Sequence, residues 1–321
     1  MDSGIVSLVV KTSSVWWSVL AACPDCGSRD LSWPDHIEHK GRCVKCARSF
    51  ELDGNILRWS GTKRKKEIVF MGVFSRLLKT FLNPLSCPLL PFRYLTQIRV
   101  ERFYRRTLSD LDIARKWASH YLRGFALPKK AVVLDFGCGR GRNVGILHQL
   151  GHSVVGQDMV AHPWWRKLPN AGFQELKDYS RLPFCDAAFD LVNEVMVLHC
   201  IPESQLLKHL QEIKRVLKPG GYWVLLENNA ESYAAKIMRS RIGRLYELVE
   251  IRKLIVENGF NEIDLSFEGF YAPHFPMIIN FLRKLCSPRK YDVSDYNSRL
   301  AGKIDPQKRG LWLLRLKRSD K

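Results

Sequence analysis

The stretch from Ala131 to Leu147, AVVLDFGCGRGRNVGIL, decides the fold. Its first four residues are apolar and include two valines, which predicts a buried strand over 131–134. The glycine-rich residues that follow predict a tight turn, and residues 143–150 predict a helix. Glycine permits positive φ and lets a ligand approach the backbone, while the helix N-terminus favours an anionic group. The sequence therefore predicts a strand, a ligand-binding loop and a helix in an α/β protein.

The positions of the acidic residue and the glycines separate two kinds of cofactor loop. A nicotinamide dinucleotide loop has glycine at the third position of G-x-G-x-x-G, where this chain has Arg142. Asp135 instead precedes Gly137, Gly139 and Gly141 in the pattern D-x-G-x-G-x-G. This pattern resembles motif I of the class I methyltransferases that depend on S-adenosylmethionine (SAM).

Three further segments stand at the distances that this family shows. Asp158 ends a second apolar strand, 153–155, where a carboxylate can accept both hydroxyls of a ribose. Asp178 and the residues up to 192 resemble the D-x-x-x-L-P-F…F-D-L-V pattern of the type-11 methyltransferase group. The run R-V-L-K-P-G-G at 215–221 resembles the turn before the family's fifth strand, predicted here at 222–226. The resemblance covers roughly residues 105–321.

The resemblance implies the fold and a set of site residues. The fold is a Rossmann-like seven-stranded sheet with helices on both faces, ending in an antiparallel hairpin at 310–316. The aspartate at 178 or its neighbour binds the adenine amino group in the family, and His199 is the candidate general base. A packing or cofactor-side role is the alternative for this histidine. The implied cofactor-binding residues are Asp135, Gly137, Cys138, Gly139, Gly141, Asp158, Met159, Asp178, Tyr179 and Asn193.

Four cysteines near the N-terminus form the pattern C-x2-C-x16-C-x2-C: Cys23, Cys26, Cys43 and Cys46. Each C-x2-C pair directs two thiolates toward one point, and two pairs supply the four sulfurs of a tetrahedral zinc site. Four protein ligands leave no open position, so we expect a structural zinc. Residues 17–27 and 50–56 around these pairs resemble the small zinc-ribbon domains similar to Trm112.

Length and composition favour a globular protein with more than one part. The 321 residues are 46% hydrophobic, which suits one domain of about 200 residues with a smaller one. No apolar run reaches the roughly 18 residues of a membrane span, and the N-terminus lacks the pattern of a signal peptide. We therefore expect a cytoplasmic protein whose nine cysteines are thiols or metal ligands.

The net charge of +19 is unevenly distributed along the chain. Residues 61–125 carry 14 Lys and Arg against 4 Asp and Glu, whereas residues 1–60 carry seven of each kind. The segment also contains a predicted amphipathic helix at 68–82 and a second basic helix at 99–123. These helices could form a lid on the catalytic domain, contact an anionic membrane surface or bind RNA. The predicted parts are a zinc ribbon at 1–60, a basic connector or lid at 61–104 and a methyltransferase domain at 105–321.

The sequence thus predicts a SAM-dependent methyltransferase. The favoured acceptor is a small or lipid-like molecule, because the type-11 pattern resembles quinone and natural-product methyltransferases and the segments near the expected pocket are apolar. An RNA base methyltransferase is the first alternative, since a zinc ribbon and a basic surface both suit RNA. A SAM-binding scaffold without catalysis is the second.

Overall fold

The computed structural model describes most of the chain outside the basic connector, and no helix in that part combines the length and apolar composition of a membrane span. The chain forms two compact units, residues 1–118 with 139–183 and residues 119–138 with 184–321. The predicted connector, Asp178 and Tyr179 lie outside the described residues. The described residues are 17–34, 40–60, 111–168, 170–176, 181–232, 235, 244–268 and 305–319.

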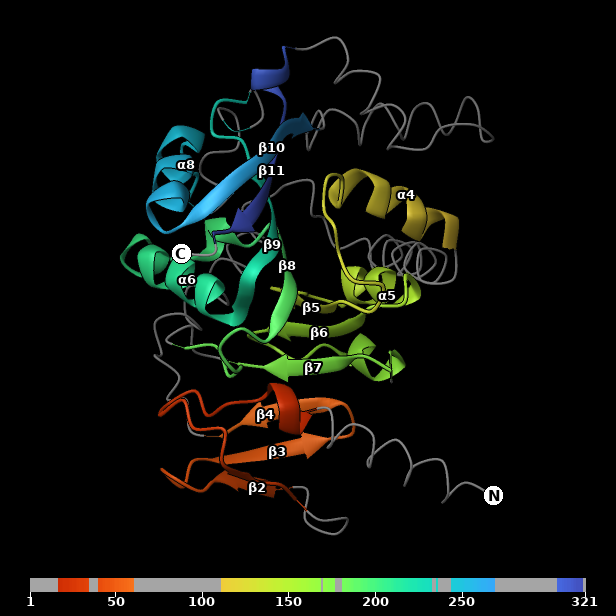
Figure 1. Ribbon diagram of the computed structural model, residues 1–321, viewed down its shortest axis with the longest axis vertical. Helices are drawn as coiled ribbons and strands as arrows, with labels where there is room; N and C mark the ends of the chain where they lie inside the picture. The colour runs from red at the N-terminus through yellow and green to blue at the C-terminus, as the bar shows by residue number, and fades with distance from the viewer. Residues whose placement is uncertain are drawn as a thin grey trace, which may run out of the picture. The chain divides into compact units, whose positions relative to one another are not determined.

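The sheet of the first unit runs in the order β1-β2-β3-β4-β7-β6, and Figure 1 shows β2, β3 and β4 beside β7. Strands β1 to β4 pair antiparallel with one another, whereas β4 and β6 both pair parallel with β7. The strands are β1 Leu31–Ser32, β2 Lys40–Cys43, β3 Ser49–Asp53, β4 Ile56–Trp59, β6 Ser153–Asp158 and β7 Gly172–Glu175.

The N-terminal cysteine-rich segment forms four of these strands, β1 to β4, and its sequence explains their form. Buried and exposed residues alternate along β2 and β3, as expected when one face of a sheet is covered. Gly54 has φ 60° in the two-residue turn between β3 and β4, where glycine costs no strain. β4 is buried at three of its four positions because it lies between β3 and β7. The segment therefore joins the sheet of the first unit instead of closing on itself.

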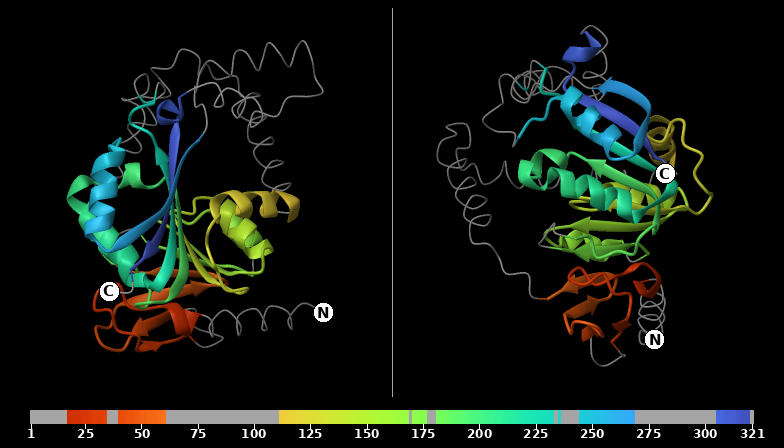
Figure 2. Two further views of the ribbon diagram at one scale, coloured as in Figure 1. Left: turned by 45° about the horizontal axis from the view of Figure 1, so that its top comes forward. Right: turned by 60° about the vertical axis from the view of Figure 1, so that its left-hand side comes forward.

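The sheet of the second unit runs in the order β5-β8-β9-β11-β10. Strands β5, β8 and β9 are parallel, and β11 pairs antiparallel with both β9 and β10, which confirms the predicted hairpin. Figures 1 and 2 show α6 and α8 on one face of the strands β9, β11 and β10. The strands are β5 Val132–Phe136, β8 Phe189–Val195, β9 Leu217–Asn228, β10 Phe260–Glu268 and β11 Leu311–Arg318.

Most predicted elements occur with small shifts at their ends. β5 extends two residues beyond the predicted 131–134 because Asp135 and Phe136 are buried and pair with β8. Of the second basic helix, predicted at 99–123, the structure describes the C-terminal part, which forms α4 and ends at Tyr121. Helices and short 3-10 turns are α4 Leu111–Tyr121, α5 Arg142–Gln149, α6 Glu203–Val216, α8 Leu248–Glu257, η1 Pro163–Lys167, η2 Leu198–Cys200 and η3 Pro306–Lys308.

One predicted turn takes a different form. The sequence predicts a turn at 215–221 before a strand at 222–226, but β9 begins at Leu217, directly after α6. Gly220 has φ 70°, and the pairing with β8 changes register between Phe189 and Leu191. The turn residues therefore form an irregular first part of the strand rather than a separate loop.

Candidate functional site

The loop between β5 and α5 adopts backbone conformations that require glycine. Gly137, Gly139 and Gly141 have φ of 67°, 53° and 82°, a region that side chains disfavour. A Cβ on Gly137 would lie 2.3 Å from the Val197 side chain, so the loop is closely packed there. Among the described residues, no atom beyond its chain neighbours lies within 4 Å of the corresponding position at Gly139. The loop therefore offers open backbone at its centre, as a bound ligand needs.

Asp158, at the end of β6, holds this open loop. Its Oδ2 accepts a hydrogen bond from the Gly139 backbone N–H at 2.7 Å, and Oδ1 accepts one from Met159 at 2.7 Å. A carboxylate has about four acceptor positions, so about two remain for ribose hydroxyls. Open backbone beside a part-exposed carboxylate fits the ribose and amino-acid ends of SAM.

A tryptophan that the sequence did not single out holds the other side of the same glycine. The indole Nε1 of Trp165, in η1, donates to the Gly139 carbonyl oxygen at 2.8 Å. Its ring is fully buried and stacks on Phe173 with centroids 4.8 Å apart. The two adjacent tryptophans after Pro163 are the sequence feature that could have indicated this contact. Aromatic residues, however, pack in the core more often than they hold a ligand-binding loop.

Asp135 and Asn193 form a buried pair on neighbouring strands. They are register partners on β5 and β8, and the Asn193 amide Nδ2 donates to Asp135 Oδ1 at 2.5 Å. Asn193 is fully buried and Asp135 is 2% exposed. The amide thus supports the carboxylate of motif I, and direct contact of Asn193 with a cofactor stays a prediction.

His199 is bound by a glutamate at the end of β9. Its Nδ1 lies 3.0 Å from both carboxylate oxygens of Glu227, and its backbone N–H donates to Glu227 Oε2 at 3.1 Å. Asn228 donates to Oε1 from its backbone and side chain at 2.6 and 2.7 Å. Five contacts therefore fix a carboxylate that is 1% exposed, and this carboxylate fixes the imidazole.

The turn before His199 is strained in a way that places this dyad. Met196, with φ 61°, follows β8, and its backbone N–H donates to the Leu226 carbonyl at 2.8 Å. Non-glycine residues with positive φ are uncommon and cluster at functional sites. The next residue, Val197, is the one that packs on Gly137. The strained turn therefore packs on Gly137 two residues before His199.

The charge of His199 limits its role. Hydrogen bonds with Cys200 and Glu227 raise its pKa to about 10, against desolvation that lowers it. The imidazole is therefore protonated at neutral pH, and both ring nitrogens carry a hydrogen that can be donated. As a cation it can hold an anionic oxygen, and it becomes a base only after losing a proton.

We expect the raised pKa to be visible in solution. The His199 ring should remain protonated at pH 8 in histidine NMR titrations, and Glu227→Gln should lower its pKa. Because the folded pKa exceeds the unfolded value of about 6.5, the stabilisation is complete below pH 6.5. It should disappear as the pH rises through about 10. A wild-type pKa near 6.5 would contradict this assignment.

The four cysteines of the N-terminal segment converge as predicted. Their Sγ atoms all lie within 4.8 Å of one another, with 3.5 Å between Cys23 and Cys46 and 3.6 Å between Cys26 and Cys43. Zinc bonded to four sulfurs at about 2.3 Å places the sulfurs about 3.8 Å apart. The donor set and its spacing therefore fit a closed zinc site.

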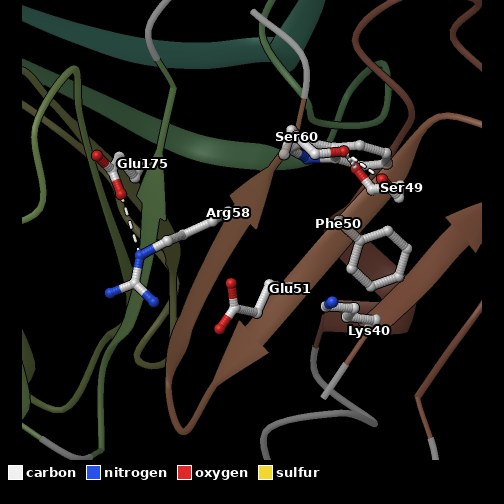
Figure 3. Close-up of a pocket in the computed structure, with 8 residues that line it drawn as sticks. Lys40, Ser49, Phe50, Glu51, Arg58, Ser60 and Glu175 are labelled. Atoms are coloured by element: carbon white, nitrogen blue, oxygen red, sulfur yellow. Dashed lines mark hydrogen bonds and ion pairs between the residues drawn. The ribbon is translucent and has the colours of Figure 1, made fainter. Parts of the chain in front are cut away.

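The pocket drawn in Figure 3 is separate from the glycine loop. It lies on the cysteine-rich strands and β7, and a row of alternating charge runs across it through Lys40, Glu51, Arg58 and Glu175. These residues are register partners on β2, β3, β4 and β7. Opposite charges on neighbouring strands stabilise this register, so the row indicates a structural role.

Comparison with known proteins finds a methyltransferase match in the middle of the chain. Residues 134–225 match the family described as Methyltransferase domain. An uncharacterized methyltransferase of Synechocystis is 36% identical over 126 residues, 37% of this chain and 58% of that protein. This match shows that residues 134–225 are similar to methyltransferase domains, and the strand order of each unit confirms the predicted α/β Rossmann-like fold.

Two further relatives have named substrates. The phthiotriol/phenolphthiotriol dimycocerosates methyltransferase of Mycobacterium tuberculosis is 31% identical over 37% of this chain and 40% of its own length. The tRNA (carboxymethyluridine(34)-5-O)-methyltransferase of Arabidopsis thaliana is 32% identical over 30% of this chain and 24% of its own length. The chain spans less than two thirds of each of these curated relatives.

Proposed function

We propose that the protein transfers a methyl group from SAM to a small-molecule or lipid-like acceptor. The observation that carries the proposal is the hydrogen bond between Asp158 and Gly139, which holds open backbone beside a carboxylate at the end of β6. Asp158 would bind the ribose hydroxyls, and the glycine loop with the α5 N-terminus would bind the amino-acid end. Asp178 and Tyr179 are proposed on the family resemblance to face the adenine.

The chain's part in the reaction is mainly positioning. Bound SAM supplies a methyl group on a positively charged sulfur, which an acceptor atom displaces in line. Holding the acceptor against that group can account for most of the acceleration. His199, fixed by Glu227, would hydrogen-bond the acceptor through Nε2. A protonated His199 favours an acceptor oxygen that is already anionic, since no proton then needs to be removed.

Cofactor binding tests the proposal first. Wild-type protein should bind one SAM per chain in calorimetry, and Asp158→Ala should weaken binding by about 100-fold or more, because two charge-assisted hydrogen bonds are lost. Asp186→Ala, which removes a carboxylate that is 72% exposed, is the matched control and should leave the affinity unchanged. Folded wild-type protein that binds no SAM would end the methyltransferase proposal.

The nature of the acceptor rests on a relative and on composition. The mycobacterial relative is named for lipid-like substrates, which supports the favoured class. The plant relative is named for a tRNA base, and the basic segment 61–125 suits an anionic polymer or membrane surface. RNA therefore remains the second candidate.

Transfer from methyl-labelled SAM separates the two classes. With a fractionated cell extract, we expect label in the organic-soluble or small-molecule fraction and none in RNA. At SAM concentrations below the dissociation constant of the Asp158→Ala variant, this variant should transfer no label. It therefore controls for adventitious labelling. Ribonuclease-sensitive label would instead establish RNA as the methyl acceptor.

We also propose that the four-cysteine cluster binds a structural zinc. Metal analysis should find one zinc per chain, and Cys43→Ser should lose it, because the closed site needs all four sulfurs. Cys185→Ser changes a buried cysteine that lies outside the cluster and should keep the metal. Wild-type protein purified without zinc, or with two, would contradict the proposal.

A further inference from the structure

The β3–β4 hairpin turn reaches from the cysteine-rich strands to the segment before β7. Asn55, in this turn, is 7% exposed, and its amide Nδ2 donates to the carbonyls of Leu168 and Ala171 at 3.0 and 2.7 Å. A longer contact of 3.4 Å reaches the Trp165 carbonyl. One side chain of the cysteine-rich segment thus closes the loop that follows η1.

That loop in turn holds the cofactor loop. Trp165 donates from Nε1 to the Gly139 carbonyl, while the Gly139 N–H is bound by Asp158. The Leu168 and Ala171 backbone N–H groups bond to the carbonyls of Trp165 and Leu168 at 3.1 Å, so the loop is one connected turn. Asn55 is therefore joined to Gly139 through a continuous set of hydrogen bonds.

A second connection runs through the backbone of the same residue. The Asn55 carbonyl accepts a hydrogen bond from the Phe173 N–H at 2.8 Å. The Phe173 ring stacks on Trp165 and lies 3.1 Å from the position that a Cβ on Gly141 would occupy. Gly141 is the N-cap of α5. The hairpin turn thus supports the loop at both Gly139 and Gly141.

Ion pairs fix the hairpin against the same strands. Asp53 pairs with Arg58 at 3.0 Å and with Arg166 of η1 at 2.7 Å. Although partial burial opposes it, hydrogen bonds from Arg166 and Arg58 hold the pKa of Asp53 below its usual range. Arg58 Nε also bonds Glu175 of β7 at 3.0 Å, as Figure 3 shows. The turn cannot move without breaking these contacts.

We propose that Asn55 is a positioning residue for the SAM-binding loop, acting through Trp165, so that the cysteine-rich strands control cofactor affinity. The inference rests on the proposed function, because it concerns the loop assigned there to SAM. It also predicts a regulatory property, since loss of the zinc proposed for the four-cysteine cluster would loosen these strands and with them the loop. The zinc site would then set cofactor affinity without touching the cofactor.

The side chain chemistry at position 55 gives the sharpest test. Asn55→Asp keeps the shape but places carboxylate oxygens against two carbonyls, and Trp165→Phe removes the N–H that holds Gly139 together with part of the buried ring. We expect each to raise the SAM dissociation constant by about 3- to 10-fold, the effect of one or two hydrogen bonds. Asn55→Ala should fall in the same range.

Matched controls separate positioning from general destabilisation. Asn258→Ala removes an amide that caps α8 by donating to the Leu254 carbonyl at 2.8 Å, in the second unit. Trp164→Phe changes the neighbouring tryptophan. Both should lower the melting temperature as much as the test variants do, with unchanged SAM affinity. Affinity that follows melting temperature across all variants would overturn the proposal.

Coupling must also act in reverse, which provides a second readout. If zinc loss weakens SAM binding, saturating SAM must raise the zinc affinity measured at equilibrium in competition with the chelator 4-(2-pyridylazo)resorcinol, because equilibrium coupling is reciprocal. This gain in zinc affinity should be lost in Trp165→Phe. Zinc-depleted protein that keeps the wild-type SAM affinity would contradict the inference.

The two failures are distinguishable. Wild-type protein without SAM binding would overturn the proposed function itself. Wild-type binding with unchanged affinity in Asn55→Asp and Trp165→Phe would leave the function standing and reject only the role of Asn55.

Discussion

The conformation of one loop constrains the rest of the candidate site. The backbone after β5 must take positive φ at three positions, and it stays in place because Asp158 binds the Gly139 N–H while Trp165 binds its carbonyl. The backbone N–H and the carbonyl of Gly139 thus both have hydrogen-bond partners in the first unit. A loop with this geometry presents backbone to a ligand without having to fold around it, which lowers the entropic cost of binding.

The cysteine-rich segment is part of this support. It continues the sheet through parallel pairing of β4 with β7, and its hairpin turn closes the loop that carries Trp165. A segment that closed on itself would give its metal only local influence. Because the strands are continuous, hydrogen bonds link the cysteine-rich strands to the glycine loop, and the side-chain bonds of Asn55 and Trp165 among them can each be removed by a single substitution.

The local helices and strands and the motif residues could be predicted from the sequence. The glycine positions, Asp158 and the four cysteines follow from short-range chemistry, in which turn geometry and ligand spacing are written in consecutive residues. Asn55 and Trp165 were missed because their partners lie more than twenty residues away in sequence, and their types carry no ligand signal. The start of β9 was misplaced because Pro219 and two glycines normally end a strand, whereas a register change absorbs them here.

For His199, too, the sequence predicted the residue but not its surroundings. His199 was found from its place after a strand, but its partner Glu227 and its raised pKa depend on burial that the sequence does not state. In the proposed function, that charge favours an anionic acceptor oxygen over removal of a proton. Substrate choice would then depend on the contact between His199 in η2 and Glu227 at the end of β9.

The central claim is that the Asp158 and Gly139 constellation holds the cofactor. Two-dimensional amide NMR of the full chain titrated with S-adenosylhomocysteine tests it most directly. We predict that the Gly139 and Met159 amides shift with saturation at one ligand per chain, because Asp158 must share its oxygens with the ribose. Saturable binding that leaves these two amides unmoved would contradict the claim.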